Sequence, residues 1–63
     1  MEEVKAVLTP DDLARRYDTS TANLASLRHF GKGPKWFKLG RRVYYRLEDV
    51  LEYERTATEE ATA

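Results

Sequence analysis

The segment Gly31–Pro34 divides this 63-residue chain into two parts with different hydrophobic patterns. Before it, capping residues and apolar residues at helical spacing predict two short helices. After it, the runs "WFKL" and "VYYR" on either side of a glycine are typical of a β-hairpin. The dividing segment itself is predicted to be a loop, because proline cannot extend a helix and glycine accepts left-handed backbone angles. This order of elements predicts a small α+β domain.

The stretch "LTPDDLARRY" predicts the first helix, which should end near Tyr17. Thr9 suits the N-cap and Pro10 the first helical position, and the two aspartates that follow complement the positive end of the helix dipole. Leu8 before the cap and Leu13 after it fit a hydrophobic staple. The residues expected in solvent on this helix are Arg15 and Arg16.

Ser20 is the predicted cap of a second helix, "TANLASLRHF", after a turn at Asp18 and Thr19. Its inward stripe is expected to hold Leu24 and Leu27, with Phe30 closing the end. Two short helices joined by a short turn form the outline of a helix-turn-helix. The outward face is small, polar or basic and contains no acid; its residues are Ala22, Asn23, Ala25, Ser26 and His29, with Arg28 at the flank.

The hairpin is predicted with Gly40 in the turn and with Arg41 and Arg42 at its tip. Alternation is expected to place Phe37, Leu39, Val43 and Tyr45 on the inner side of the strands. The residues expected to point outward are Lys38, Tyr44 and Arg46. Trp36 falls opposite Phe37 by alternation, yet a large apolar ring usually packs.

A third helix is predicted over 47–55, with an apolar side made by Leu47, Val50, Leu51 and Tyr53. The domain is therefore expected over 8–55, after a flexible lead-in over 1–7. The acidic, small-residue tail over 56–63 is expected to be disordered.

Charge is separated along the chain although the net charge is zero. Between Thr19 and Arg46 there is no acid, and the cations are Arg28, Lys32, Lys35, Lys38, Arg41, Arg42 and Arg46. From Glu48 to Glu60 the balance reverses, because Arg55 is the one cation among six acids. The middle of the chain is therefore expected to meet an anion.

The ordered set of "LTPDDLARRY", the Ser20-capped helix, "GKGP", "FKLGRRVYYR" and "LEDV" resembles the phage excisionases of the MerR-like winged-helix group, especially mycobacteriophage-type ones. The resemblance covers about Leu8 to Tyr53. It implies a winged helix-turn-helix with a two-stranded β-hairpin wing and a C-terminal third helix. It also implies an excisionase, or recombination directionality factor, that binds repeated sites near a phage attachment site, bends DNA cooperatively beside neighbouring copies and directs a tyrosine integrase toward excision. Arginines often occupy the outward helix positions of relatives, whereas this chain has Ala25 and Ser26, which shifts weight onto the wing.

Double-stranded DNA is thus the expected ligand. Asn23 and Ser26 are candidates for reading base edges, and Ser20 and Thr21 for holding a phosphate at the positive helix end. By resemblance, Arg41 approaches the minor groove or its phosphates. The full set of predicted DNA-binding residues is Ser20, Thr21, Ala22, Asn23, Ser26, Arg28, His29, Lys38, Arg41 and Arg42.

Several of these residues have an alternative interpretation. His29 is also explained as an exposed residue at a helix end, and Ser20 caps its helix whether or not DNA is present. Tyr44 is open to a purely covering role on the wing. A transcriptional regulator of the same MerR-like fold remains the nearest alternative function, followed by a protein-binding adaptor that uses the third helix.

An enzyme is not expected. Ser26 and His29 lie one helical turn apart, but no orienting carboxylate accompanies them. One histidine and no cysteine leave no plausible zinc site, and no metal or cofactor is predicted. Without cysteine, signal peptide or long apolar run, the chain is expected to be a soluble cytoplasmic protein, with no membrane partner. The resemblance to phage excisionases implies that this cytoplasm is that of a bacterial host cell.

Overall fold

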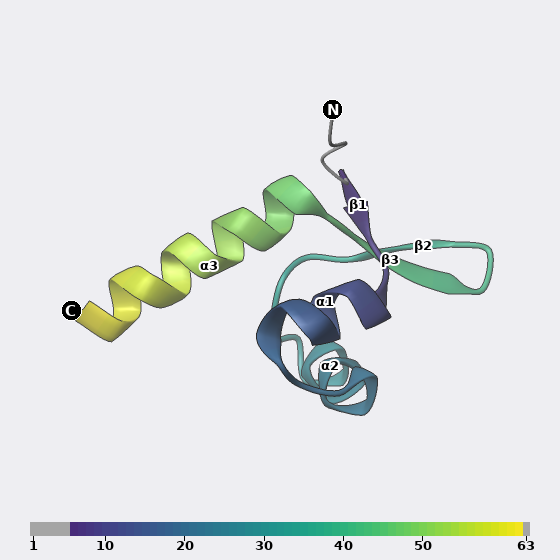
Figure 1. Cartoon of the computed structure of the whole chain (residues 1–63), viewed down its shortest axis with the longest axis horizontal. Coiled ribbons are helices and arrows are strands. Elements are labelled where there is room, and N and C mark those ends of the chain that lie inside the picture. The colour runs from purple at the N-terminus through teal and green to yellow at the C-terminus, as the bar shows by residue number, and fades with distance from the viewer. Residues whose placement is uncertain (1–5, 63) are drawn as a thin grey trace.

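A computed structural model describes residues 6–62 of the chain (Figure 1). Three helices pack with a three-stranded antiparallel sheet of strand order β1-β3-β2, which confirms the predicted small α+β domain. The elements in chain order are β1 (Val7–Leu8), α1 (Pro10–Tyr17), α2 (Thr21–His29), β2 (Phe37–Leu39), β3 (Arg42–Arg46) and α3 (Leu47–Thr62).

Both predicted helix caps are confirmed. The Thr9 hydroxyl accepts a hydrogen bond from the backbone N–H of Asp12 at 3.1 Å, and the Asp12 carboxylate accepts one from the Thr9 N–H at 3.0 Å. This reciprocal capping box fixes the start of α1. Ser20 Oγ likewise accepts from the N–H of Asn23 at 3.1 Å and starts α2. Between the helices the chain reverses at Asp18, whose φ of 52° ends α1.

The hairpin is confirmed, but the predicted facing of β2 is wrong. The loop holds two residues, Gly40 with a φ of 63° and Arg41, so that Phe37 pairs with Tyr44 and Leu39 with Arg42. Directly paired residues share a face of the sheet, and a register shift of one reverses every side chain. Phe37 and Leu39 therefore lie on the outer face with Tyr44, opposite the buried Tyr45.

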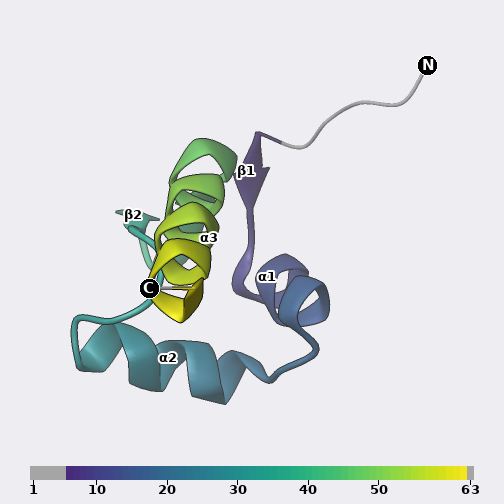
Figure 2. The same ribbon diagram turned by 90° about the vertical axis from the view of Figure 1, so that its left-hand side faces the viewer.

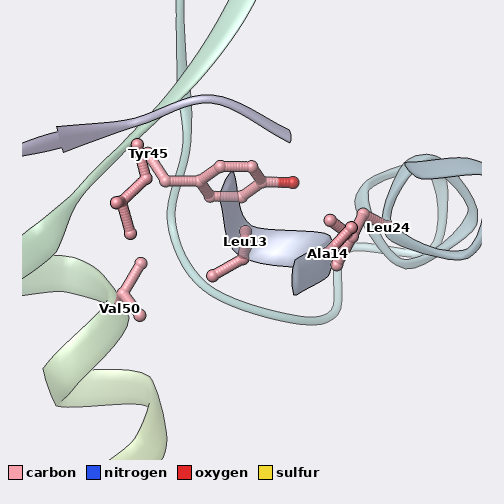
Figure 3. Close-up of a cluster of buried hydrophobic side chains, with 6 residues drawn as sticks. Leu13, Ala14, Leu24, Tyr45 and Val50 are labelled. Carbon is pink, nitrogen blue, oxygen red and sulfur yellow. The ribbon is translucent and has the colours of Figure 1, made fainter. Parts of the chain in front are cut away.

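The core lies between the inner face of the sheet and the three helices. Tyr45 crosses its middle, with Leu13 beneath the ring and Val50 of α3 to one side (Figure 3). On the other side lie Ala14 and Leu24, where α1 meets α2. The buried hydrophobic residues of this core are Leu8, Leu13, Ala14, Leu24, Tyr45 and Val50.

The ends of the domain differ from expectation. Val7, which was assigned to the lead-in, belongs to β1 and pairs with Arg46 of β3. Next to this pair, Leu47 donates its backbone N–H to the carbonyl of Ala6 at 2.8 Å. Positions 1–5 of the lead-in lie outside the described residues. The tail prediction is wrong, because α3 continues to Thr62. Alanine and glutamate favour helix, and neither glycine nor proline follows Gly40 to stop it.

Two apolar residues expected on inward faces are exposed. Phe30, at the end of α2, is 70% exposed, and Leu51 on α3 is 48% exposed. In a domain of only 63 residues, each helix buries a narrow stripe of side chains. Leu24 occupies that stripe on α2 and Val50 occupies it on α3. None of the helices within residues 6–62 is long and apolar enough to cross a membrane.

Candidate nucleic-acid interface

One side of α2 faces solvent along its whole length. Leu24 holds the opposite side against α1, so the helix runs along the margin of the molecule (Figure 2). The exposed residues are those predicted from the spacing: Ala22, Asn23, Ala25, Ser26 and His29. The face carries no acid, and two of its members are alanines that permit close approach of a large surface.

The first turn of α2 is organised by its own side chains. Besides the Ser20 cap, the Asn23 side-chain N–H donates to Thr19 Oγ1 at 3.0 Å. The Asn23 amide is thus directed back toward the cap. Ser26 makes no side-chain hydrogen bond within the described part of the chain and remains directed at solvent. Of the two predicted base readers, Ser26 is the less constrained.

The hairpin tip carries three exposed cations, as predicted. Arg41 lies in the two-residue loop, while Arg42 is the first residue of β3 rather than part of the loop. Lys38, which was predicted on the outer face, instead lies on the face of its partner Val43, and Arg42 lies on the face of Leu39. The tip is therefore basic on both faces and at its end.

The outer face of the sheet is an aromatic and cationic surface. The sequence predicted Tyr44 and Arg46 on this face, but it did not predict Phe37 there. The rings of Phe37 and Tyr44 lie 5.9 Å apart, and the Arg46 guanidinium sits 4.4 Å from the Phe37 ring centroid. Tyr44 is half-buried in this group, in agreement with the covering role considered for it. Assuming a two-residue loop of Gly40 and Arg41 would have predicted this face, because that loop pairs Phe37 with Tyr44 and so puts both rings on the same side of the sheet.

Arg28 turns toward the sheet rather than along the exposed face of α2. Its Nη1 donates to the Tyr45 hydroxyl at 2.6 Å, and its guanidinium carbon lies 5.9 Å from the ring centroids of both Tyr45 and Trp36. The side chain is half-buried. The neighbouring His29 packs its ring edge-on against Phe30 at 5.1 Å, at the exposed end of the helix.

Arg16 is exposed, as expected, and its side chain also joins α1 to α3. Its Nε and Nη2 donate to the two carboxylate oxygens of Glu54 at 2.6 and 2.9 Å, and the Tyr17 hydroxyl donates to Glu54 at 2.7 Å. The hydrogen bonds from Arg16 and Tyr17 lower the pKa of Glu54 to about 2. Burial, together with the bond to Glu54, raises the pKa of Tyr17, and the bond to Glu54 raises that of Arg16.

The two charged regions project in different directions. In Figure 1 the hairpin extends to one side of the molecule and α3 to the other, with α1 and α2 below and between them. The acids of α3 are therefore kept away from the hairpin tip. Within residues 6–62, no group of three or more histidine, aspartate or glutamate side chains is placed to hold a metal ion.

No model of a protein family matches the chain, and a search of curated proteins likewise finds no match.

Proposed function

We propose that this protein binds double-stranded DNA as a winged helix-turn-helix module, with α2 in the major groove and the hairpin as the wing. The observation that carries the proposal is the exposed, acid-free face of α2 in a molecule whose hairpin carries four exposed cations, Lys38, Arg41, Arg42 and Arg46. A solvated helix normally mixes charges of both signs. A face without carboxylates suits a closely approaching polyanion.

The chemistry divides between the two elements. The hairpin cations neutralise phosphates, which releases condensed counterions and gives affinity that falls with salt. Ser20 and Thr21 offer hydroxyl and backbone donors at the positive end of α2, where a phosphate is stabilised. Ser26 contacts base edges in the major groove, and Asn23, one turn earlier on α2, is the second candidate for such a contact.

The more specific role that we propose is that of an excisionase. Its support is the resemblance of the ordered motifs over about Leu8 to Tyr53 to phage excisionases. Such a protein binds adjacent sites near an attachment sequence, bends the DNA and favours excision by a tyrosine integrase. A module of this size offers little contact area, so neighbouring copies supply affinity that one copy lacks. A transcriptional regulator would use the same binding chemistry.

Two experiments test these proposals in order. Electrophoretic mobility shifts of the wild-type protein with short duplexes at two salt concentrations should show binding that weakens steeply at the higher salt. Lack of any shift at low salt would contradict DNA binding and favour an adaptor. Reconstituted recombination with a cognate integrase then separates the roles: stimulated excision supports the excisionase, and binding without stimulation supports the regulator.

A further inference from the structure

The C-terminal half of α2 is tied to the sheet by one cationic side chain. Leu24 anchors the N-terminal half of the helix against α1. One turn later, Arg28 reaches across to β3 and donates to the Tyr45 hydroxyl at 2.6 Å. The two ends of the helix are thus held by different partners.

Arg28 also lies near two aromatic rings. Its guanidinium carbon lies 5.9 Å from the centroids of Tyr45 and of Trp36, the residue that precedes β2. A planar guanidinium that donates to one group and stacks near two rings has a defined position, which a lysine ammonium does not reproduce. The ring of Tyr45 is itself only 1% exposed and spans the core, so the acceptor is fixed (Figure 3).

We infer that Arg28 is a positioning residue, which sets the orientation of α2 relative to the hairpin through Tyr45 and Trp36, and not a phosphate contact. The inference rests on the proposed function only where DNA binding is the readout. A duplex presents its groove and its neighbouring phosphates at a fixed separation, so a helix and a wing must be held at a matching angle. Loosening the Arg28 contact allows α2 to rotate and lowers affinity without removing any charge from the DNA interface.

The test compares four variants on the short duplex that wild-type protein selects most tightly from random-sequence DNA. Tyr45→Phe removes the acceptor and keeps the ring, and Arg28→Gln removes the charge. Arg28→Lys keeps the charge without the planar fork. Tyr53→Phe is the matched control, because Tyr53 is half-buried on α3 and its hydroxyl makes no hydrogen bond within the described residues.

A positioning role predicts that Tyr45→Phe and both Arg28 variants weaken binding by a similar factor of about three to ten, the range of one hydrogen bond. The salt slope stays at the wild-type value, and the double variant Arg28→Gln with Tyr45→Phe loses no more than either single variant. Tyr53→Phe binds as wild type. Wild-type affinity in Tyr45→Phe would contradict the positioning role. A salt slope that is lowered by about one unit in Arg28→Gln but not in Arg28→Lys would assign Arg28 to a phosphate contact instead.

Trp36 supplies a readout without DNA, since it is the one tryptophan of the chain. Quenching of its fluorescence by acrylamide should increase in Tyr45→Phe and in Arg28→Gln, and remain unchanged in Tyr53→Phe, with each variant shown to be folded by circular dichroism. Unchanged quenching in Tyr45→Phe would overturn the inference. If the wild-type protein selects no duplex, the proposed function fails, while the fluorescence measurement still decides whether the cluster holds α2.

Discussion

Arg16 and Glu54, 38 positions apart in the chain, form a two-pronged ion pair between α1 and α3. The Tyr17 hydroxyl completes the arrangement by donating to the same carboxylate. These three polar groups join α3 to the end of α1, one turn after Val50 enters the core. The position of α3 therefore depends on a bond whose strength varies with pH.

Replacing Glu54 with glutamine should lower the free energy of unfolding at neutral pH by up to about 1 kcal/mol, because both partners are partly exposed. Urea unfolding measures the loss. The exposed Glu60→Gln variant on the same helix is the control and should unfold as wild type. Equal stability of Glu54→Gln and wild type would show that the ion pair contributes nothing in solution.

The same pair predicts a pH dependence with a definite sign. The pKa of Glu54 falls from 4.5 to about 2 in the folded chain, so its contribution is complete above about pH 4.5. It is lost as the pH falls from there toward 2. The stability difference between wild type and Glu54→Gln should therefore shrink across this window, measured by urea unfolding at several pH values. A difference that stays constant down to pH 2 would contradict the assignment.

Thr9→Ala should destabilise the domain by about 1 kcal/mol, since it removes the hydrogen bond from the Asp12 N–H to the Thr9 hydroxyl at the start of α1. Chemical denaturation followed by circular dichroism measures this loss. Thr21→Ala is a matched control, because Thr21 is exposed and lies inside α2 after the Ser20 cap. A loss of the same size in both variants would indicate a general effect of threonine removal.

Arg41→Ala should weaken binding to every duplex by a similar factor and lower the salt slope by about one unit, because one phosphate contact is lost. Mobility shifts at a series of salt concentrations give the slope. Arg55→Ala removes the same charge from α3 and should leave the slope unchanged. Wild-type affinity of Arg41→Ala at low salt would remove the hairpin from the proposed interface.

Ser26→Ala should reduce the preference for a selected duplex over a random one by about 1–3 kcal/mol, the range of a good base contact. Competition binding with the two duplexes measures the preference. Asn23→Ala should lose less, because the Asn23 amide already donates to Thr19. If Ser26→Ala weakens both duplexes equally, Ser26 does not read sequence.

Deleting residues 56–63 should leave the unfolding midpoint and the affinity for a single site unchanged, because the side chains over 56–61 are exposed and outside the core. On DNA with adjacent sites, the deletion should lower cooperativity if the acids of α3 contact a neighbouring copy. Titrations on one-site and two-site duplexes separate the two quantities. Undiminished cooperativity would exclude this segment from contacts between copies.

The local features of the fold were predictable from short stretches of sequence. Thr9 and Ser20 mark helix starts because their side-chain oxygens accept from a backbone N–H three residues later. Pro10 marks the first start because its ring already fixes a helical φ. The hairpin was predictable from Gly40 and its flanking β-formers, but its register was not. Whether the loop has two residues or three decides which face Phe37 occupies, and only the pairing with Tyr44 settles it.

The long-range polar contacts were beyond sequence reasoning. Arg16 and Arg28 are both arginines on amphipathic helices, with nothing nearby to reveal that their partners are Glu54 and Tyr45. Each partner becomes adjacent only when the chain has folded. The exposed face of α2 was predictable because it follows from helical period and from the buried position of Leu24.

The opposite placement of the basic hairpin and the acidic α3 separates positive from negative charge and so gives a molecule of zero net charge a dipole moment. A neutral body gains little from uniform attraction to a polyanion, but a dipole experiences a torque in the field near one. The protein should therefore rotate so that Arg41 and Arg42 face a negatively charged surface before the two come into contact. Screening confines this alignment to about 8–10 Å at physiological ionic strength, so the encounter is oriented in its last step only.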